Sequence, residues 1–279
     1  MAPAERGRRG MSAFFEALQF PFMYRALIVG VLVSLCAALL GVVLVLKHYS
    51  LIGHGLGEVG FAALALAVAL ELPPMTVAIP MVVVASFLIM YLSQRAGSSG
   101  EIAIAILSTA ALSTGVLITS VSKGFNVDVS GYMFGSILAM TKSDVYLSGA
   151  LSALVLMMYG LLFNRLFAIT YDEINARATG INVTMYQFII SFLTAITVVL
   201  GMRMMGTMLI SSLIIFPAIT ARRLVGSFKA MTILAAVVSI ICFFIGLCAS
   251  FVWSLPTGAS VVGVNLIVLL ISRLVPVKN

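Results

Sequence analysis

Long apolar runs separated by short polar breaks are the feature that most constrains the fold of this chain. Of its 279 residues, 62% are hydrophobic and only 9% are charged, whereas soluble globular chains carry about 25% charged residues. A membrane-spanning helix needs about 20 mostly apolar residues. Nine runs approach that length: 26–46, 51–70, 75–92, 101–121, 145–169, 185–200, 208–221, 231–253 and 259–274. The sequence therefore predicts an all-α, polytopic membrane protein with about nine transmembrane helices, and eight to ten are compatible with the pattern.

The apolar runs form one transmembrane domain flanked by two short segments. We expect an N-terminal tail with an interfacial helix at 1–25 and a transmembrane domain at 26–275. A C-terminal tail is expected at 276–279. Residues 12–25 are rich in aromatic side chains but are short and interrupted by Pro21, which favours a helix lying in the membrane interface. Met11 is an alternative start. A short helix or re-entrant piece is expected at 131–138.

Basic residues outnumber acidic ones, 16 against 9. In a membrane protein this excess marks cytoplasmic loops, and no stretch has the aromatic and basic character of a nucleic-acid groove. If the polar loop 170–180 is cytoplasmic, nine basic residues lie inside and three outside. These are Lys47, Arg95, Arg165, Arg177, Arg222, Arg223, Lys229, Arg273 and Lys278 inside, and Lys123, Lys142 and Arg203 outside. The loops 93–100, 170–184 and 222–230 are therefore predicted to be cytoplasmic, while the side of the N-terminus stays open.

An ionisable pair inside the second apolar run is the strongest functional signal. His54 and Glu58 are four residues apart within Ser-Leu-Ile-Gly-His-Gly-Leu-Gly-Glu-Val-Gly, residues 50–60, so a helix places them on one face. A charge deep in a membrane costs about 2.5–3.5 kcal/mol and needs a partner, a cavity or an ion. An imidazole and a carboxylate are ordinary ligands of zinc-like ions. The pair predicts a transport site, and a packing hydrogen bond in a glycine-rich seam is the alternative.

The polar stretch 170–180 predicts a short capped helix between two spans. Asp172 and Glu173 follow Tyr171 and match the chemistry of a helix start, and Gly180 suits the position just after a helix end. Such a helix would be a docking point for a partner protein, and a merely solvated turn is the alternative.

Catalytic motifs are absent from the sequence. It contains no phosphate-binding loop of the form Gly-x-x-x-x-Gly-Lys-Ser/Thr, no His-Glu-x-x-His and no Gly-x-Ser-x-Gly. The chain is therefore not expected to be an enzyme, and any ATP chemistry must come from another polypeptide. No permanently bound cofactor is expected. The three cysteines lie in apolar runs without metal-finger spacing, which favours packing roles.

Six stretches in a characteristic order carry a family resemblance. They are 46–53 (LKHYSLIG), 101–106 (EIAIAI), 132–138 (YMFGSIL), 171–180 (YDEINARATG), 206–218 (GTMLISSLIIFPA) and 256–259 (PTGA). With them the chain resembles the permease subunits of zinc, manganese and iron ATP-binding-cassette (ABC) importers. In that family the second span typically reads Gly-Asp-Ala-Leu-Ser-His, and its Asp and His line the pathway. Here His54 and Glu58 occupy the matching positions in reversed chemical order, which leaves the identity of the metal open.

The resemblance implies a function and a set of partners. It implies a permease of the bacterial cytoplasmic membrane that moves Zn²⁺, Mn²⁺ or Fe²⁺ by alternating access, with His54 and Glu58 as metal ligands. It also implies a second permease copy, two cytoplasmic ATPase subunits that use ATP and dock on a coupling loop at 170–182, and an external metal-binding protein. Two alternatives remain: a stand-alone secondary transporter with Glu58 as a proton-linked site, and an ABC permease for an organic metal chelate.

Overall fold

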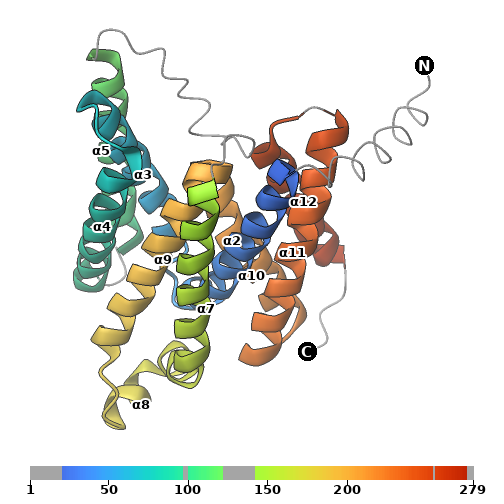
Figure 1. Cartoon of the computed structure of the whole chain (residues 1–279). Helices are drawn as coiled ribbons and strands as arrows, with labels where there is room; N and C mark the ends of the chain where they lie inside the picture. The colour runs from blue at the N-terminus through green and yellow to red at the C-terminus, as the bar shows by residue number, and fades with distance from the viewer. Residues whose placement is uncertain (1–20, 97–99, 122–141, 254, 275–279) are drawn as a thin grey trace.

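The structure, a computed structural model, describes residues 21–96, 100–121, 142–253 and 255–274. Every regular element within these ranges is an α-helix (Figure 1). The helices are α2 (Pro21–Leu46), α3 (Ile52–Ala69), α4 (Pro74–Ala96), α5 (Gly100–Val121), α7 (Lys142–Tyr171), α8 (Glu173–Ala178), α9 (Val183–Met205), α10 (Thr207–Leu224), α11 (Phe228–Trp253) and α12 (Thr257–Leu274). The all-α prediction is confirmed, and the helix expected at 131–138 lies outside the described residues.

Eight of the described helices are long and apolar enough to cross a membrane, within the predicted range of eight to ten. The eight are α2, α3, α4, α5, α7, α9, α11 and α12. The remaining predicted run, 208–221, lies in α10, which is the least apolar of the long helices because it contains two serines and ends in Arg222 and Arg223. α10 packs on α2, α3, α9, α11 and α12, so its serines are buried inside the protein rather than facing lipid.

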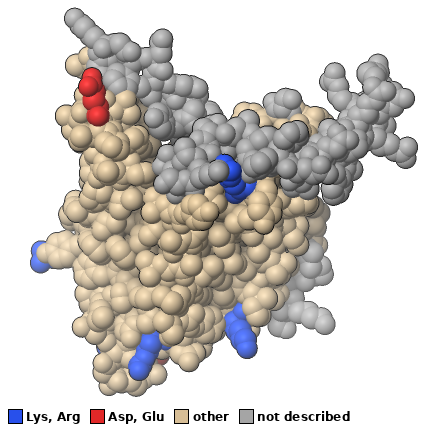
Figure 2. Space-filling model, viewed as in Figure 1, with Lys and Arg blue, Asp and Glu red and all other residues tan. Residues whose placement is uncertain are grey.

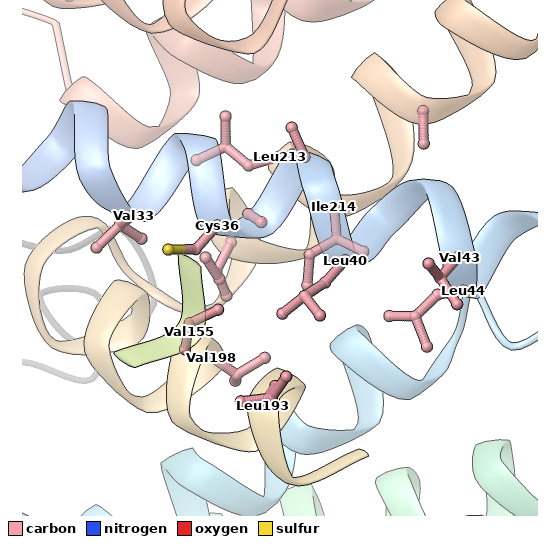
Figure 3. Packing of buried hydrophobic residues seen from close by; sticks show 14 of the residues in the cluster. Val33, Cys36, Leu40, Val43, Leu44, Val155, Leu193, Val198, Leu213 and Ile214 are labelled. Atoms are coloured by element: carbon pink, nitrogen blue, oxygen red, sulfur yellow. The ribbon is translucent and has the colours of Figure 1, made fainter. Parts of the chain in front are cut away.

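Helices α2 and α10 form the centre of the bundle. Gly41 of α2 lies against the backbone carbonyl of Ile214 in α10, and a Cβ at Gly41 would collide with it. Small residues allow such close approach of helix backbones in membrane proteins. Side chains of four helices interdigitate around this contact (Figure 3): Val33, Cys36, Leu40, Val43 and Leu44 of α2, Val155 of α7, Leu193 and Val198 of α9, and Leu213 of α10.

Two groups of helices flank this centre (Figure 1). Helices α3, α4 and α5 pack on one another at one side, α11 and α12 lie at the other, and α7 and α9 pack against α2. The 30 residues of α7 make a helix about 45 Å long, longer than the hydrocarbon core of about 30 Å. Figure 1 shows α8 at the end of α7, beyond the ends of the other helices.

Several basic helix ends lie on the same side as α8. Lys47, just after α2, donates hydrogen bonds to the carbonyl of Ile169 near the end of α7 and to the carboxylate of Glu173 in α8. Arg223, in the last turn of α10, donates to two carbonyls at the end of α12. The ends of α2, α10 and α12 also line one common cavity. The basic residues after α2 and at the end of α10 therefore lie on the same side of the bundle. The predicted gathering of basic residues on one side agrees with these contacts.

The outer surface carries few charges. Figure 2 shows that the Lys, Arg, Asp and Glu side chains in view lie towards the margins of this face, and the broad surface between them carries none. Exposed leucines, isoleucines and phenylalanines cover the helices instead, among them Leu161 and Ile233. An apolar belt with charges at its edges is the arrangement that a lipid bilayer requires.

The first helix begins earlier than predicted. α2 starts at Pro21, and its candidate span covers Met23–Leu46. Residues 21–25 therefore belong to α2, and residues 23–25 to its candidate span, so the helix begins five residues before the predicted residue 26. Pro21 does not interrupt the run because proline is tolerated in the first helical turn, where its missing N–H has no intrahelical acceptor. Helix α4 likewise continues to Ala96, so Arg95, expected in a loop, lies in its last turn.

Candidate functional site

Helix α3 is packed so closely that it holds its ionisable pair at a fixed height in the bundle. A Cβ at Gly53 would lie 2.7 Å from Cδ1 of Ile214, and a Cβ at Gly57 would lie 3.4 Å from Cβ of Thr207. Ile214 is near the middle of α10, and Thr207 is its first residue, at the end away from α8. The segment that carries His54 and Glu58 is therefore level with the first half of α10, between its middle and the end that lies away from α8.

His54 and Glu58 meet as the sequence predicts. Nε2 of His54 lies 3.2 Å from Oε1 of Glu58, and the two side chains are 51% and 17% exposed. The second carboxylate oxygen, Oε2 of Glu58, is buried and has no hydrogen-bond partner among the described residues. A buried carboxylate oxygen without a partner is costly. The pair can therefore accept a cation or a proton at the open oxygen, next to an imidazole that faces outward.

The pair is short of a complete metal site. Within the described residues, no group of three or more His, Cys, Asp or Glu side chains could hold a metal ion. Metal sites in proteins commonly use four ligands, or three with an open position. His48, the other histidine of the chain, lines a separate cavity at the end of α2. Cys36, in contrast, is buried in the α2 core and donates a weak hydrogen bond to the carbonyl of Ser152.

The predicted capped helix at 170–180 is present as α8. Asp172 is its N-cap, with extended backbone and a carboxylate that accepts a hydrogen bond from the backbone N–H of Asn175, 2.9 Å away. At the other end Gly180 has φ +84°. The N–H groups of Gly180 and Ile181 donate back to carbonyls inside α8, which is the glycine-terminated helix ending known as the Schellman motif. The two ends of α8 are thus fixed by residues that the sequence identified.

Glu173 ties α8 to the rest of the protein. Its carboxylate accepts hydrogen bonds from Lys47 Nζ and Arg177 Nη2, both at 2.7 Å, and from Gln187 Nε2 at 3.3 Å. Burial favours the neutral acid, but the hydrogen bonds and positive charges of Lys47 and Arg177 outweigh it and lower the pKa of Glu173. The partly buried phenol of Tyr49 responds in the opposite way, because burial and the nearby Glu173 charge raise its pKa.

Sequence reasoning missed three residues at this end of the protein. Ile174 is 84% exposed although it stands on a helix only six residues long, and Tyr171, which the sequence did indicate, is 66% exposed beside it. An isoleucine among polar neighbours was the available signal for Ile174. Lys47 and Gln187 gave no such signal, because their contacts with Glu173 join distant parts of the chain.

The chain matches the family model described as ABC 3 transport family over residues 19–276. It is 27% identical to the manganese import system permease protein ScaB of Streptococcus gordonii, over 95% of this chain and 96% of that protein. It is 29% identical to the high-affinity zinc uptake system membrane protein ZnuB of Haemophilus influenzae, over 87% and 93%.

A solved structure has the same architecture. The structure described as PsaBC from Streptococcus pneumoniae in complex with Fab aligns with a TM-score of 0.83 and 28% identity, covering 94% of this chain and 95% of that one. The eight apolar helices and these relatives agree with a multi-pass protein of the cytoplasmic membrane. The resemblance inferred from the six sequence stretches is confirmed, and the chain belongs to the ABC 3 transport family.

Proposed function

We propose that this chain is the membrane-spanning permease subunit of an ABC importer for a divalent transition metal, Mn²⁺ or Zn²⁺. The observation that carries the proposal is the pair on α3: a carboxylate with one buried, unpartnered oxygen beside an outward-facing imidazole, at Glu58 and His54. Relatives named for manganese and zinc transport support the choice of metals. Imidazole and carboxylate ligands suit these ions better than Mg²⁺, which prefers oxygen alone, or Cu⁺, which prefers sulfur.

A second copy of the chain would complete the ligand set. One chain offers one nitrogen and at most two oxygens, and the side chain of His54 is half exposed. Two copies facing each other would supply two imidazoles and two carboxylates, a set sufficient for a four-coordinate ion. The set divided between two subunits also suits transport, because separating the subunits weakens the site and releases the ion.

The ATPase partner would dock on α8. Asp172 caps the helix and Glu173 is bonded to Lys47, Arg177 and Gln187, so the two acids build the helix and fix its position. The contact surface is then supplied by Tyr171 and Ile174, whose exposed side chains would bury apolar area against the partner. An external metal-binding protein would approach the opposite end of the bundle.

Transport assays of the complete system test this proposal. The chain, its second copy, the ATPase and the binding protein would be produced together in cells that lack their own manganese and zinc importers. Radioactive Mn²⁺ and Zn²⁺ uptake would be measured for the unchanged chain, His54→Ala, Glu58→Gln and the control Glu101→Gln, an exposed acid at the start of α5. We expect both pair variants to lose most uptake while still reaching the membrane, and the control to retain it.

The same assay distinguishes the alternatives. An ATPase variant unable to hydrolyse ATP should abolish uptake if the chain is an ABC permease, whereas a proton-linked secondary transporter would be unaffected. Competition by a chelated metal that outperforms the free ion would indicate an organic chelate as substrate. Normal uptake by His54→Ala and Glu58→Gln, with unchanged metal preference, would contradict the assigned site.

A further inference from the structure

A cavity of about 430 Å³ opens at the basic end of the bundle, separate from the His54–Glu58 pair and from α8. It lies between the ends of α10 and of two candidate membrane spans, α2 and α12. Its polar lining consists of Arg222 and Arg223 from α10, Arg273 from α12, and His48 and Ser50 from the connection that follows α2. Among the residues that the structure describes, no acidic side chain lines it.

Of the three arginines, Arg223 has a clear role in holding helices together. Arg223 donates through Nε and Nη2 to the carbonyls of Ser272 and Arg273, both at 3.0 Å. It thereby satisfies carbonyls that the end of α12 leaves without intrahelical partners. Arg222 and the side chain of Arg273 form no ion pair with an acid in the described part of the chain, and both residues are exposed.

The floor of the cavity differs from its rim. Val45, Ile219 and Leu269 supply apolar surface beneath the cationic groups. His48 is held at φ 59°, a left-handed backbone conformation that non-glycine residues rarely adopt and that is frequent at ligand sites. A pocket with cations at the rim and aliphatic side chains below, at the level where membrane helices end, matches the chemistry of a lipid: an anionic headgroup joined to apolar chains.

We propose that this cavity binds the phosphate of an anionic phospholipid. The guanidinium groups of Arg222 and Arg273 provide the planar, paired donors that suit phosphate oxygens. Arg223 and Ser50 add further donors, and the glycerol and upper acyl region rest on the apolar floor. A lipid held here would add a second polar link between α10 and α12, beside the hydrogen bonds that Arg223 donates to the end of α12. The site stands independently of the proposed metal transport.

Thermal unfolding of the purified full chain in neutral lipid–detergent micelles tests the site. Phosphatidylglycerol, phosphatidylcholine or inorganic phosphate would be added to the unchanged chain, to Arg222→Gln/Arg273→Gln, to Arg222→Lys/Arg273→Lys and to the control Arg95→Gln/Arg165→Gln. The control removes two positive charges from the same side of the protein but outside the cavity. We expect phosphatidylglycerol to raise the unfolding midpoint of the unchanged chain by several degrees, and the neutral lipid and inorganic phosphate to have little effect. The control should show the same rise of the unfolding midpoint with phosphatidylglycerol. The lysine variant should show part of this rise, and the glutamine variant should show little of it.

A second measurement keeps the proposal testable if the glutamine variant folds poorly. Native mass spectrometry would count phosphatidylglycerol molecules retained by each variant, and the glutamine variant should retain one fewer than the control. An equal shift with inorganic phosphate would overturn the lipid assignment, because the headgroup alone would then explain binding. Unchanged lipid retention in the glutamine variant, with loss of ATPase binding instead, would overturn it by identifying the arginines as a protein contact.

Discussion

Lys47 and Glu173 are 126 positions apart in the chain, yet Nζ of the lysine lies 2.7 Å from Oε2 of the glutamate. Lys47 stands in the short connection that leads from α2 into α3, the helix that carries His54 and Glu58. Glu173 is the first residue of α8. The exposed helix at the end of the bundle is therefore tied by an ion pair to the segment that enters the helix with the proposed metal ligands.

The first prediction concerns this ion pair. Lys47→Met removes one of the three donors to the Glu173 carboxylate and the side-chain donor to the carbonyl of Ile169. Because Glu173 is partly exposed and keeps two donors, we expect a loss of about 1 kcal/mol of stability, below the usual range for charged hydrogen bonds. The uptake rate should fall more than this small loss of stability explains, because movement of α8 would no longer be transmitted to the connection before α3. A double-mutant cycle with Glu173→Gln would measure both quantities, and the effects of the two changes should be less than additive.

Two comparisons make this cycle decisive. Lys47→Arg keeps a positive donor and should restore part of the uptake. Arg165→Gln, on the exposed surface of α7, removes a charge from the same side and should change neither quantity. Strictly additive effects of Lys47→Met and Glu173→Gln on uptake would show that the pair does not transmit movement.

The second prediction concerns acid sensitivity. In the unfolded chain Glu173 titrates near its ordinary pKa of 4.5, and in the folded protein its pKa is lower. A carboxyl group of this kind contributes stability above the unfolded pKa and loses it as the pH falls through the folded pKa. The unfolding midpoint should therefore fall less steeply below about pH 4.5 in Glu173→Gln than in the unchanged chain. Parallel pH profiles of the two proteins would contradict the assigned hydrogen bonds.

The third prediction concerns the exposed face of α8. Ile174→Ser should weaken co-purification of the ATPase and reduce ATP-dependent uptake, while the thermal stability of the isolated chain stays the same because the side chain is 84% exposed. Leu70→Ser is the matched control: Leu70 is also exposed, at 56%, but it follows α3 at the end away from α8. If both variants retain the ATPase equally well, α8 does not dock through Ile174.

Local chemistry made part of this structure predictable from the sequence. His54 and Glu58 meet because residues four apart share a helix face, and α8 is capped by Asp172 and Gly180 because capping involves only neighbouring residues. The apolar runs likewise predicted most helix boundaries, since burial in lipid depends on length and composition. Pro21 was misleading because proline breaks a helix in its interior but starts one at its end.

Contacts between distant segments could not be predicted in the same way. The Lys47–Glu173 ion pair and the cavity lined by Arg222 and Arg273 depend on which helix ends lie together. Hydrophobicity does not specify this, because many packings bury the same apolar area. The position of His48 in the cavity and its left-handed backbone likewise become visible only in the structure.

The last prediction exchanges the chemistry of the two proposed ligands. His54→Asp with Glu58→His would place a carboxylate first and an imidazole four residues later, the order typical of the resembled permeases. The two positions share one face of α3, so the exchanged side chains remain within reach of each other. The position of Glu58 is more buried than that of His54, so the exchange moves the charge outward and lowers the cost of the apolar surroundings. We expect the double variant to recover a substantial part of the uptake that His54→Asp alone loses. The ratio of Mn²⁺ to Zn²⁺ transport should also change, because the two ions differ in their preference for imidazole nitrogen and carboxylate oxygen. Isotope uptake with both metals, normalised to the amount of chain in the membrane, measures this directly. Recovery without any change in the ratio would mean that the pair is needed for structure and that metal selection occurs elsewhere.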